Sequence, residues 1–77
     1  MNPGDLVIVN DDTWLYGGES YLEFIIKTTI KKGTLGFILD IQEHKDPLDD
    51  QLSVRYTRVS FPGWIGWVHS EYIGVVR

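Results

Sequence analysis

Apolar side chains recur along this chain in short runs where they alternate with polar ones, as in half-buried β-strands. In residues 52–57 the apolar positions are Leu52, Val54 and Tyr56, with polar residues between them. In residues 33–42 one face carries four apolar side chains, Leu35, Phe37, Leu39 and Ile41. Both segments are predicted to be core strands.

Three further segments have the composition of strands: residues 5–10, 64–68 and 72–76. The first is rich in Val and Ile, which favour extended chain. The Pro-Gly pair at residues 62–63 predicts a tight turn that joins two strands as a hairpin. Residues 45–50, which are mostly polar, are predicted to be a surface loop. Five short strands predict an all-β fold closed into a small barrel, because closure removes exposed sheet edges.

Residues 11–27 follow neither a clean period of two nor one of 3.6. Gly17 and Gly18 interrupt the segment, and Ser20 and Glu23 have the spacing of a helix capping box. We predict a long excursion between the first and second barrel strands. A two-stranded arm and a single helical turn are both open for it.

The length of 77 residues allows one domain, residues 1–77, because a second hydrophobic core would have too few residues. Apolar residues make up 43% of the chain, and three Trp, four Tyr and three Phe supply large side chains for one core. At this size burial and conformational entropy nearly cancel, so we expect marginal stability unless a partner adds contacts.

The chain has no cysteine, which excludes disulfides, thiolate ligands and a cysteine nucleophile. Its first residues lack the basic segment and apolar run of a signal peptide, and no stretch approaches the ~20 apolar residues that span a bilayer. The expectation is a soluble cytoplasmic protein.

Charge is distributed unevenly around the net value of −4. Five acidic residues and no base lie between Asp5 and Glu23, and five acidic residues with one lysine lie between Asp40 and Asp50. Nucleic-acid binding normally needs a basic stripe that releases counterions from phosphate. The pattern therefore argues against nucleic-acid binding and against an anionic membrane surface.

The C-terminal run Gly63-Trp-Ile-Gly-Trp-Val-His-Ser-Glu-Tyr-Ile-Gly-Val-Val76 resembles the end of SH3 domains and their bacterial relatives. In that family a Gly-aromatic-aliphatic strand leads through one 3₁₀ turn to a Tyr and a last strand. Residues 30–33, Ile-Lys-Lys-Gly, look like the diverging turn before the second barrel strand. The resemblance implies a five-stranded SH3-like barrel with a long first loop and one 3₁₀ turn before the last strand.

SH3 domains bind proline-rich peptides on an aromatic-lined groove. Trp67 and Tyr72 stand at positions that resemble groove aromatics, and Trp14 or Tyr16 can replace those of the long first loop. Two departures weaken the carry-over, since Leu52-Ser53 replaces a Trp pair and His69 replaces a proline in the 3₁₀ turn. The alternative role of Trp67 and Tyr72 is to close the barrel end.

Residues 52–66, with the opening Gly4-Asp-Leu-Val-Ile-Val9, are also similar to the SH3-like stromal accessory subunit of photosystem I. That subunit docks on larger membrane-bound proteins and assists contact with soluble electron carriers. It relies on basic residues, whereas this chain is acidic. The similarity is an analogy of fold, which does not establish function.

Candidate chemistry is sparse. The two histidines, His44 and His69, lie in different predicted loops, and Ser70 is merely adjacent to His69. Residues 43–50 contain several carboxylates that can approach a hard cation, but lack the glycine and distal glutamate of a calcium loop. We expect no catalytic residue, no cofactor and no metal.

The leading hypothesis is a small non-enzymatic protein-interaction module or accessory subunit of a larger assembly, whose partner is a protein or peptide. The residues predicted for its contact face are Trp14, Tyr16, Trp67 and Tyr72. The alternatives are a nucleic-acid-associated SH3-like barrel, which belongs to another functional class, and a photosystem-type accessory subunit. A homodimer formed through the edge of the long first loop is a further expectation.

Overall fold

The computed structural model describes residues 1–17, 25–46 and 49–76, with the side chains of 44–46, 49 and 50 left aside. The described residues are all-β and form seven strands, not the five predicted, because the first excursion contributes two of its own. The strands are β1 (Leu6–Val9), β2 (Thr13–Gly17), β3 (Ile25–Ile30), β4 (Leu35–Asp46), β5 (Asp49–Phe61), β6 (Trp64–His69) and β7 (Ile73–Val75).

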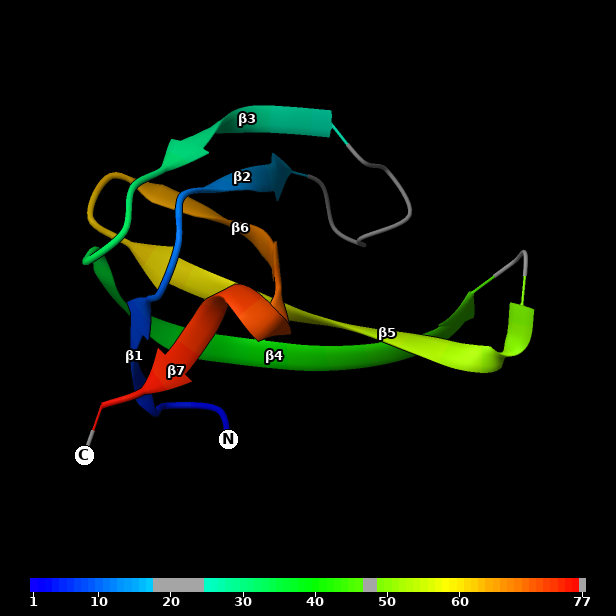
Figure 1. The fold of residues 1–77 in the computed structure, drawn as a ribbon. Coiled ribbons are helices and arrows are strands. Elements are labelled where there is room, and N and C mark those ends of the chain that lie inside the picture. Colours follow the sequence, from blue (N-terminus) through cyan, green and yellow to red (C-terminus); the bar gives the residue numbers. More distant parts are fainter. Residues whose placement is uncertain (18–24, 47–48, 77) are drawn as a thin grey trace.

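The strands form one curled antiparallel sheet in the order β3-β2-β6-β5-β4-β1-β7 (Figure 1). Chain neighbours β4, β5 and β6 lie side by side, whereas β1 lies between β4 and β7, so the two ends of the chain meet in the sheet. The curled sheet forms a half-barrel. Closure of the barrel stays a prediction.

The excursion that follows the first strand contains a two-stranded arm, one of the two conformations left open for it. β2 pairs with β3 from Thr13 opposite Ile30 to Gly17 opposite Ile25. β2 also joins β6, where Tyr16 lies opposite Trp67. The arm is therefore part of the main sheet. The capping-box residues Ser20 and Glu23 lie outside the described residues.

The long hairpin of β4 and β5 replaces most of the predicted polar loop at residues 45–50. β4 continues to Asp46 and β5 begins at Asp49, with Asp46 opposite Asp49. The physical reason is that pairing satisfies backbone N–H and C=O groups along both strands. The predicted loop is wrong except at residues 47 and 48, which lie outside the described residues.

The main core lies inside the curl of the sheet and consists of aliphatic side chains and one phenylalanine: Val7, Val9, Leu15, Ile30, Ile38, Val59, Phe61, Val68 and Ile73. On β4 the sequence pattern indicated the wrong face, because Leu35, Phe37 and Leu39 are exposed while Ile38 is buried. A β-bulge explains why Ile41 still packs on the core. Ile38 lies opposite Val59 and Asp40 opposite Arg58, so Leu39 is extra and the alternation shifts by one residue.

Two turns and one 3₁₀ segment appear where the sequence predicts them. Thr34 N donates to Lys31 O at 3.2 Å, and Gly33 has a φ of 90°, which an L side chain rarely adopts. Gly63 has a φ of 80° in the Pro-Gly turn between β5 and β6. Ser70–Tyr72 forms the 3₁₀ segment η2 before β7.

Candidate functional site

A second hydrophobic cluster lies on the opposite face of β5 and β6 from the main core. Successive residues of a strand point to opposite faces, so Trp67 points away from the core that contains Val68. Trp67 packs with Tyr56 in this cluster, and Tyr16 and Val54 cover it in part. Trp67 is 1% exposed. The buried Tyr56 and Trp67 therefore form a packed aromatic layer beneath the more exposed rings.

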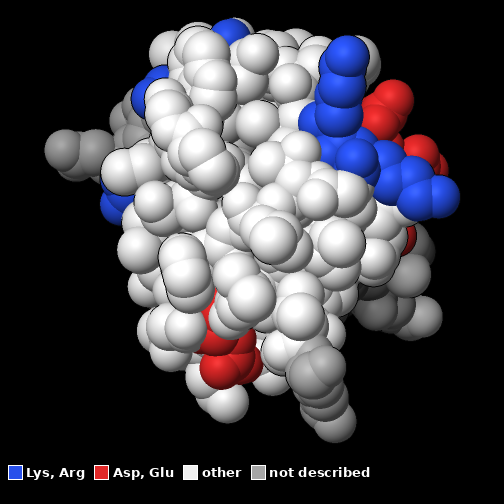
Figure 2. Space-filling model, turned by 90° about the vertical axis from the view of Figure 1, so that its left-hand side faces the viewer, with Lys and Arg blue, Asp and Glu red and all other residues white. Residues whose placement is uncertain are grey.

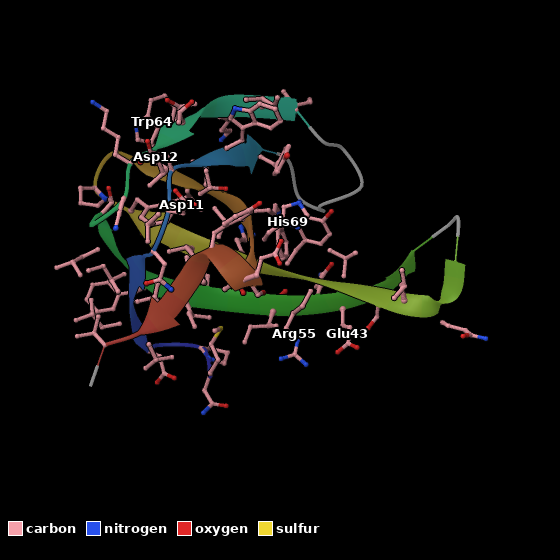
Figure 3. The ribbon with its side chains drawn as sticks, in the orientation of Figure 1. Asp11, Asp12, Glu43, Arg55, Trp64 and His69 are labelled. Atoms are coloured by element: carbon pink, nitrogen blue, oxygen red, sulfur yellow. The ribbon has the colours of Figure 1, made fainter. Side chains whose placement is uncertain are left out.

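His69 links this layer to the 3₁₀ segment. Its ring centroid lies 4.6 Å from that of Tyr56 in a tilted arrangement. It makes edge-on contacts with Tyr16 at 6.3 Å and with Tyr72 at 5.9 Å. Edge-to-face geometry at such separations is favourable for aromatic rings. His69 thus joins side chains from β2, β5 and η2, and Figure 3 shows it between β2 and the 3₁₀ segment.

An open pocket of about 470 Å³ lies on these rings. Its lining comes from β2, β3, the residues before β2 and the 3₁₀ region: Asp12, Thr13, Trp14, Tyr16, Thr29, His69 and Tyr72. Trp14 lies opposite Thr29 across the β2–β3 pair and is 55% exposed. A large, exposed indole beside a hollow of this kind provides apolar contact area to an incoming chain at low entropic cost.

The structure brings together three of the four residues predicted for the contact face. Trp14, Tyr16 and Tyr72 line the pocket, whereas Trp67 lies in the buried cluster. The sequence reasoning missed His69 as a member of the site and treated it as a departure from the family pattern. The available signal was its place at the 3₁₀ turn, beside Tyr72.

Asp12 supplies the negative charge of the pocket. Its carboxylate accepts a hydrogen bond from the backbone N–H of Lys32 at 2.8 Å, which ties the start of β2 to the turn before β4. Asp11 lies next to it and accepts from the backbone N–H of Asp12 at 2.9 Å. Figure 3 shows both aspartates at the same end of the arm. This end of the pocket is therefore acidic.

A second hollow, of about 340 Å³, lies on the other side of His69. Its lining comes from β5, the end of β6 and η2: Ser53, Val54, Arg55, His69, Ser70 and Glu71. Because both hollows include His69, they form adjacent parts of one surface across β2, η2 and β5.

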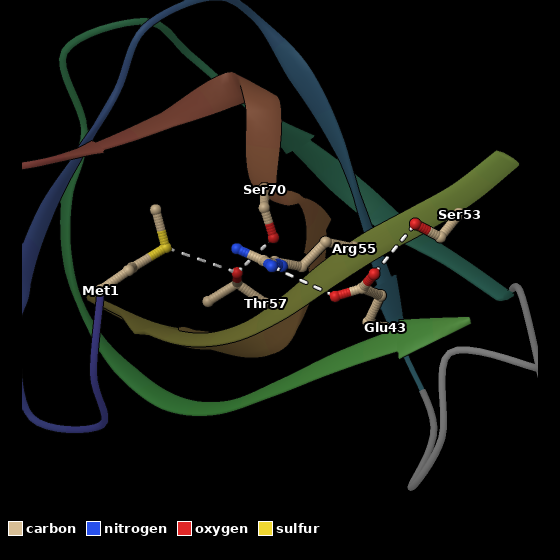
Figure 4. Close-up of polar contacts among 6 residues, drawn as sticks. All are labelled: Met1, Glu43, Ser53, Arg55, Thr57 and Ser70. Atoms are coloured by element: carbon tan, nitrogen blue, oxygen red, sulfur yellow. Dashed lines mark hydrogen bonds and ion pairs between the residues drawn. The ribbon is translucent and has the colours of Figure 1, made fainter. Parts of the chain in front are cut away.

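An ion pair stands at the edge of the second hollow (Figure 4). Arg55 Nη2 donates to Glu43 Oε2 at 3.1 Å, and Ser53 Oγ donates to Glu43 Oε1 at 2.9 Å. The Ser53 hydroxyl, followed by the Arg55 guanidinium, lowers the pKa of Glu43 below its ordinary value. All three residues belong to paired strands, with Glu43 directly opposite Arg55.

A buried hydroxyl pair holds the 3₁₀ segment on β5. Thr57 Oγ1 and Ser70 Oγ lie 2.6 Å apart, and Met1 Sδ lies 3.9 Å from the same threonine oxygen (Figure 4). Thr57 is fully buried on the core side of β5. This contact fixes the position of η2 and hence of His69 and Tyr72 at its ends.

Within residues 1–17, 25–46 and 49–76, no helix is long and apolar enough to cross a membrane. Among the side chains that the structure describes, those of residues 1–17, 25–43 and 51–76, no three potential metal ligands gather. The side chains of residues 44–50, which the sequence offered as a cation site with Glu43, are outside the description. Comparisons with protein-family models, curated proteins and solved structures give no match.

Proposed function

We propose that this chain is a non-enzymatic protein-interaction module that binds an extended peptide segment of another protein on its aromatic pocket. The observation that carries the proposal is the half-exposed Trp14 beside Tyr16, Tyr72 and His69 around an open hollow. At protein interfaces a few clustered residues carry most of the binding energy, and Trp and Tyr are common among them.

The partner's chemistry follows from the lining of the pocket. Aromatic walls suit an extended peptide segment with apolar or proline side chains. A proline-containing segment of this kind has little conformational entropy to lose on binding. Asp12 at one end and Glu71 beside the second hollow favour a partner with a basic side chain. Arg55, which also lines the second hollow, is paired with Glu43.

We further propose that the half-barrel is an SH3-like domain. Three features support this relation: the turn at Lys31–Thr34 before β4, the 3₁₀ segment Ser70–Tyr72 before the last strand, and the pairing of β1 with β7. The position of the pocket beside the excursion and the 3₁₀ segment is a fourth. The strand count of seven differs from the five of the sequence prediction because the excursion is itself paired.

The test uses a display library of random peptides selected on the full chain, followed by calorimetric titration of the selected peptide. Trp14→Ala removes the exposed indole of the pocket. Trp64→Ala is the matched control, because Trp64 is 45% exposed and does not line the pocket. Both side chains are exposed at the surface, so both variants keep the fold, which near-ultraviolet circular dichroism checks.

Trp14→Ala is expected to weaken the selected peptide at least ~10-fold, and Trp64→Ala to leave its affinity unchanged. Equal affinities for the wild type and Trp14→Ala would contradict the proposal. Failure to select any peptide, together with salt-sensitive binding of mixed oligonucleotides, would favour the nucleic-acid alternative instead.

A further inference from the structure

An apolar row crosses the outer surface of the sheet, away from the aromatic pocket. Residues directly opposite one another on paired strands point to the same face. Leu6 lies opposite Phe37, Phe37 opposite Ser60, and Ser60 opposite Ile65. Val76 extends the row, since its N–H donates to Leu6 O at 2.9 Å. The row therefore runs over the strands from β6 to the end of the chain.

Three residues of the row, Leu6, Phe37 and Ser60, line a hollow of about 410 Å³, and its described lining is apolar apart from that serine. Phe37 is 55% exposed and Ile65 46%, while the short side chain of Ser60 lies between them. Leu35, on the same face two residues before Phe37, is 47% exposed and also lines the hollow. The surface thus has both projecting side chains and a recess.

None of the described residues that line this hollow is charged: they are Leu6, Leu35, Gly36, Phe37, Ser60, Phe61 and Pro62. The left-hand side of Figure 1, seen face-on in Figure 2, is mostly uncharged, and the charged side chains lie toward its edges. At the rim, Lys27 Nζ lies 3.5 Å from Ile65 O. An apolar surface rimmed by polar groups is typical of a protein–protein contact.

We propose that this face binds a second copy of the chain in a two-fold symmetric dimer. Its exposed apolar side chains present roughly 500 Å², at the upper end for a monomer surface. Two such faces bury roughly 1,000 Å² together, which reaches the lower limit of a specific interface. In a two-fold contact the same surface meets itself, so projecting Phe37 and Ile65 side chains lie over the recess of the other copy.

Charge favours a second copy at this face over the edge of the sheet. The chain has a net charge of −4, so two copies repel each other, and a contact surface without charged side chains adds no close like-charge pairs to that repulsion. The alternative contact, the edge strand β3, is interrupted by a bulge, because Leu15 pairs with Thr28 and Tyr16 with Ile26, which leaves Lys27 extra. A bulge and a lysine are features that oppose edge-to-edge pairing.

The experiment is sedimentation velocity of the full chain over a range of concentrations, with three variants. Phe37→Asp places a charge in the proposed contact. Leu52→Asp is the matched control, since Leu52 is 56% exposed and lies outside the hollow. Ile26→Asp tests the β3 edge, where Ile26 is 53% exposed. Because the chain has no cysteine, Ser60→Cys and Leu52→Cys additionally report proximity through oxidative cross-linking.

The wild type is expected to rise from the monomer mass of 8.9 kDa to twice that value. Phe37→Asp raises the dissociation constant of the dimer at least ~10-fold, because the symmetric contact contains the substitution twice. Leu52→Asp and Ile26→Asp leave it unchanged, and Ser60→Cys cross-links faster than Leu52→Cys. A wild type that stays monomeric up to about 1 mM overturns the proposal, as does a dimer lost in Ile26→Asp but kept in Phe37→Asp. The aromatic pocket shares no residue with this face, so the two proposals fail independently.

Discussion

Tyr16 and Trp67 lie directly opposite each other where β2 joins β6, and their side chains share the face that carries the aromatic pocket. Tyr16 is half-buried and lines the pocket, whereas Trp67 is buried beneath it. This one strand-pairing position therefore places Tyr16, which forms part of the surface of the site, next to Trp67, which supports it from below. The two residues have different roles, which substitutions can separate.

Trp67→Ala is expected to destabilise the protein by about 3–5 kcal/mol, because it leaves a large cavity under the pocket. For a chain of this size that is a substantial part of the total stability. The measurement is the midpoint of urea unfolding, monitored by fluorescence and circular dichroism. A loss below about 1 kcal/mol with strongly impaired peptide binding would contradict a supporting role and indicate a contact residue.

Gly66→Ala is expected to separate β2 from β6. An added Cβ would lie 2.5 Å from Tyr16 O and 2.7 Å from Leu15 Cγ, and the backbone oxygen cannot move away without loss of strand pairing. We expect a destabilisation of about 1–3 kcal/mol in chemical unfolding, and increased amide exchange in β2 and β3. Unchanged exchange in the arm would show that β2 does not depend on this close approach.

Thr57→Val removes the hydroxyl that pairs with Ser70 and keeps the side-chain volume. We expect a loss of about 1–2 kcal/mol, because Ser70 Oγ then lacks its partner at a half-buried position. Thr29→Val, at an exposed position, is the control and should change stability by less than about 0.5 kcal/mol. Equal effects of the two substitutions on the urea midpoint would disagree with a buried hydroxyl pair.

Glu43→Gln is expected to show a pH-dependent effect. The folded-state pKa of Glu43 is lowered, so its contribution to stability is present above the unfolded-state value of about 4.3 and is lost as pH falls through the folded-state pKa. The urea midpoint of Glu43→Gln should therefore lie slightly below that of the wild type at neutral pH. The two midpoints should coincide in strong acid, where the wild-type carboxyl is protonated. A gap that persists there would show that the effect is not electrostatic.

The sequence predicted the all-β class and the hairpin turn at Gly63 because strand period and Pro-Gly chemistry are local signals. The 3₁₀ turn was predicted instead from the resemblance of the C-terminal run to the end of SH3 domains. Which face of β4 points into the core was not predictable in this way. Both faces of residues 33–42 carry apolar side chains, and the bulge at Leu39, which decides which face is inside, depends on pairing with β5. The pairing of residues 13–17 with residues 25–30 was likewise only one of two alternatives. Glycines interrupt the sequence pattern of this segment, and the strand that holds β2 in the sheet, β6, is distant in the chain.

The sequence indicated which types of residue form the candidate site, but not which of their side chains are exposed and which are buried. The resemblance to SH3 groove aromatics indicated Tyr72 at the 3₁₀ turn and Trp14 or Tyr16 in the long first loop, and the fold brings all three to one pocket. Whether an aromatic residue lies on the surface or below it depends on neighbouring strands. Trp67 is buried because Tyr16 and Tyr56 come from β2 and β5 to cover it, and that contact has no signature in local sequence.

The most direct test of the contact face is amide shift mapping by nuclear magnetic resonance, with the selected peptide titrated into the nitrogen-labelled full chain. The largest changes are predicted at residues 12–16 and 69–72 and at the indole N–H of Trp14. Changes centred instead on Phe37, Ile65 or Trp64, with the pocket residues unmoved at saturation, would contradict the account.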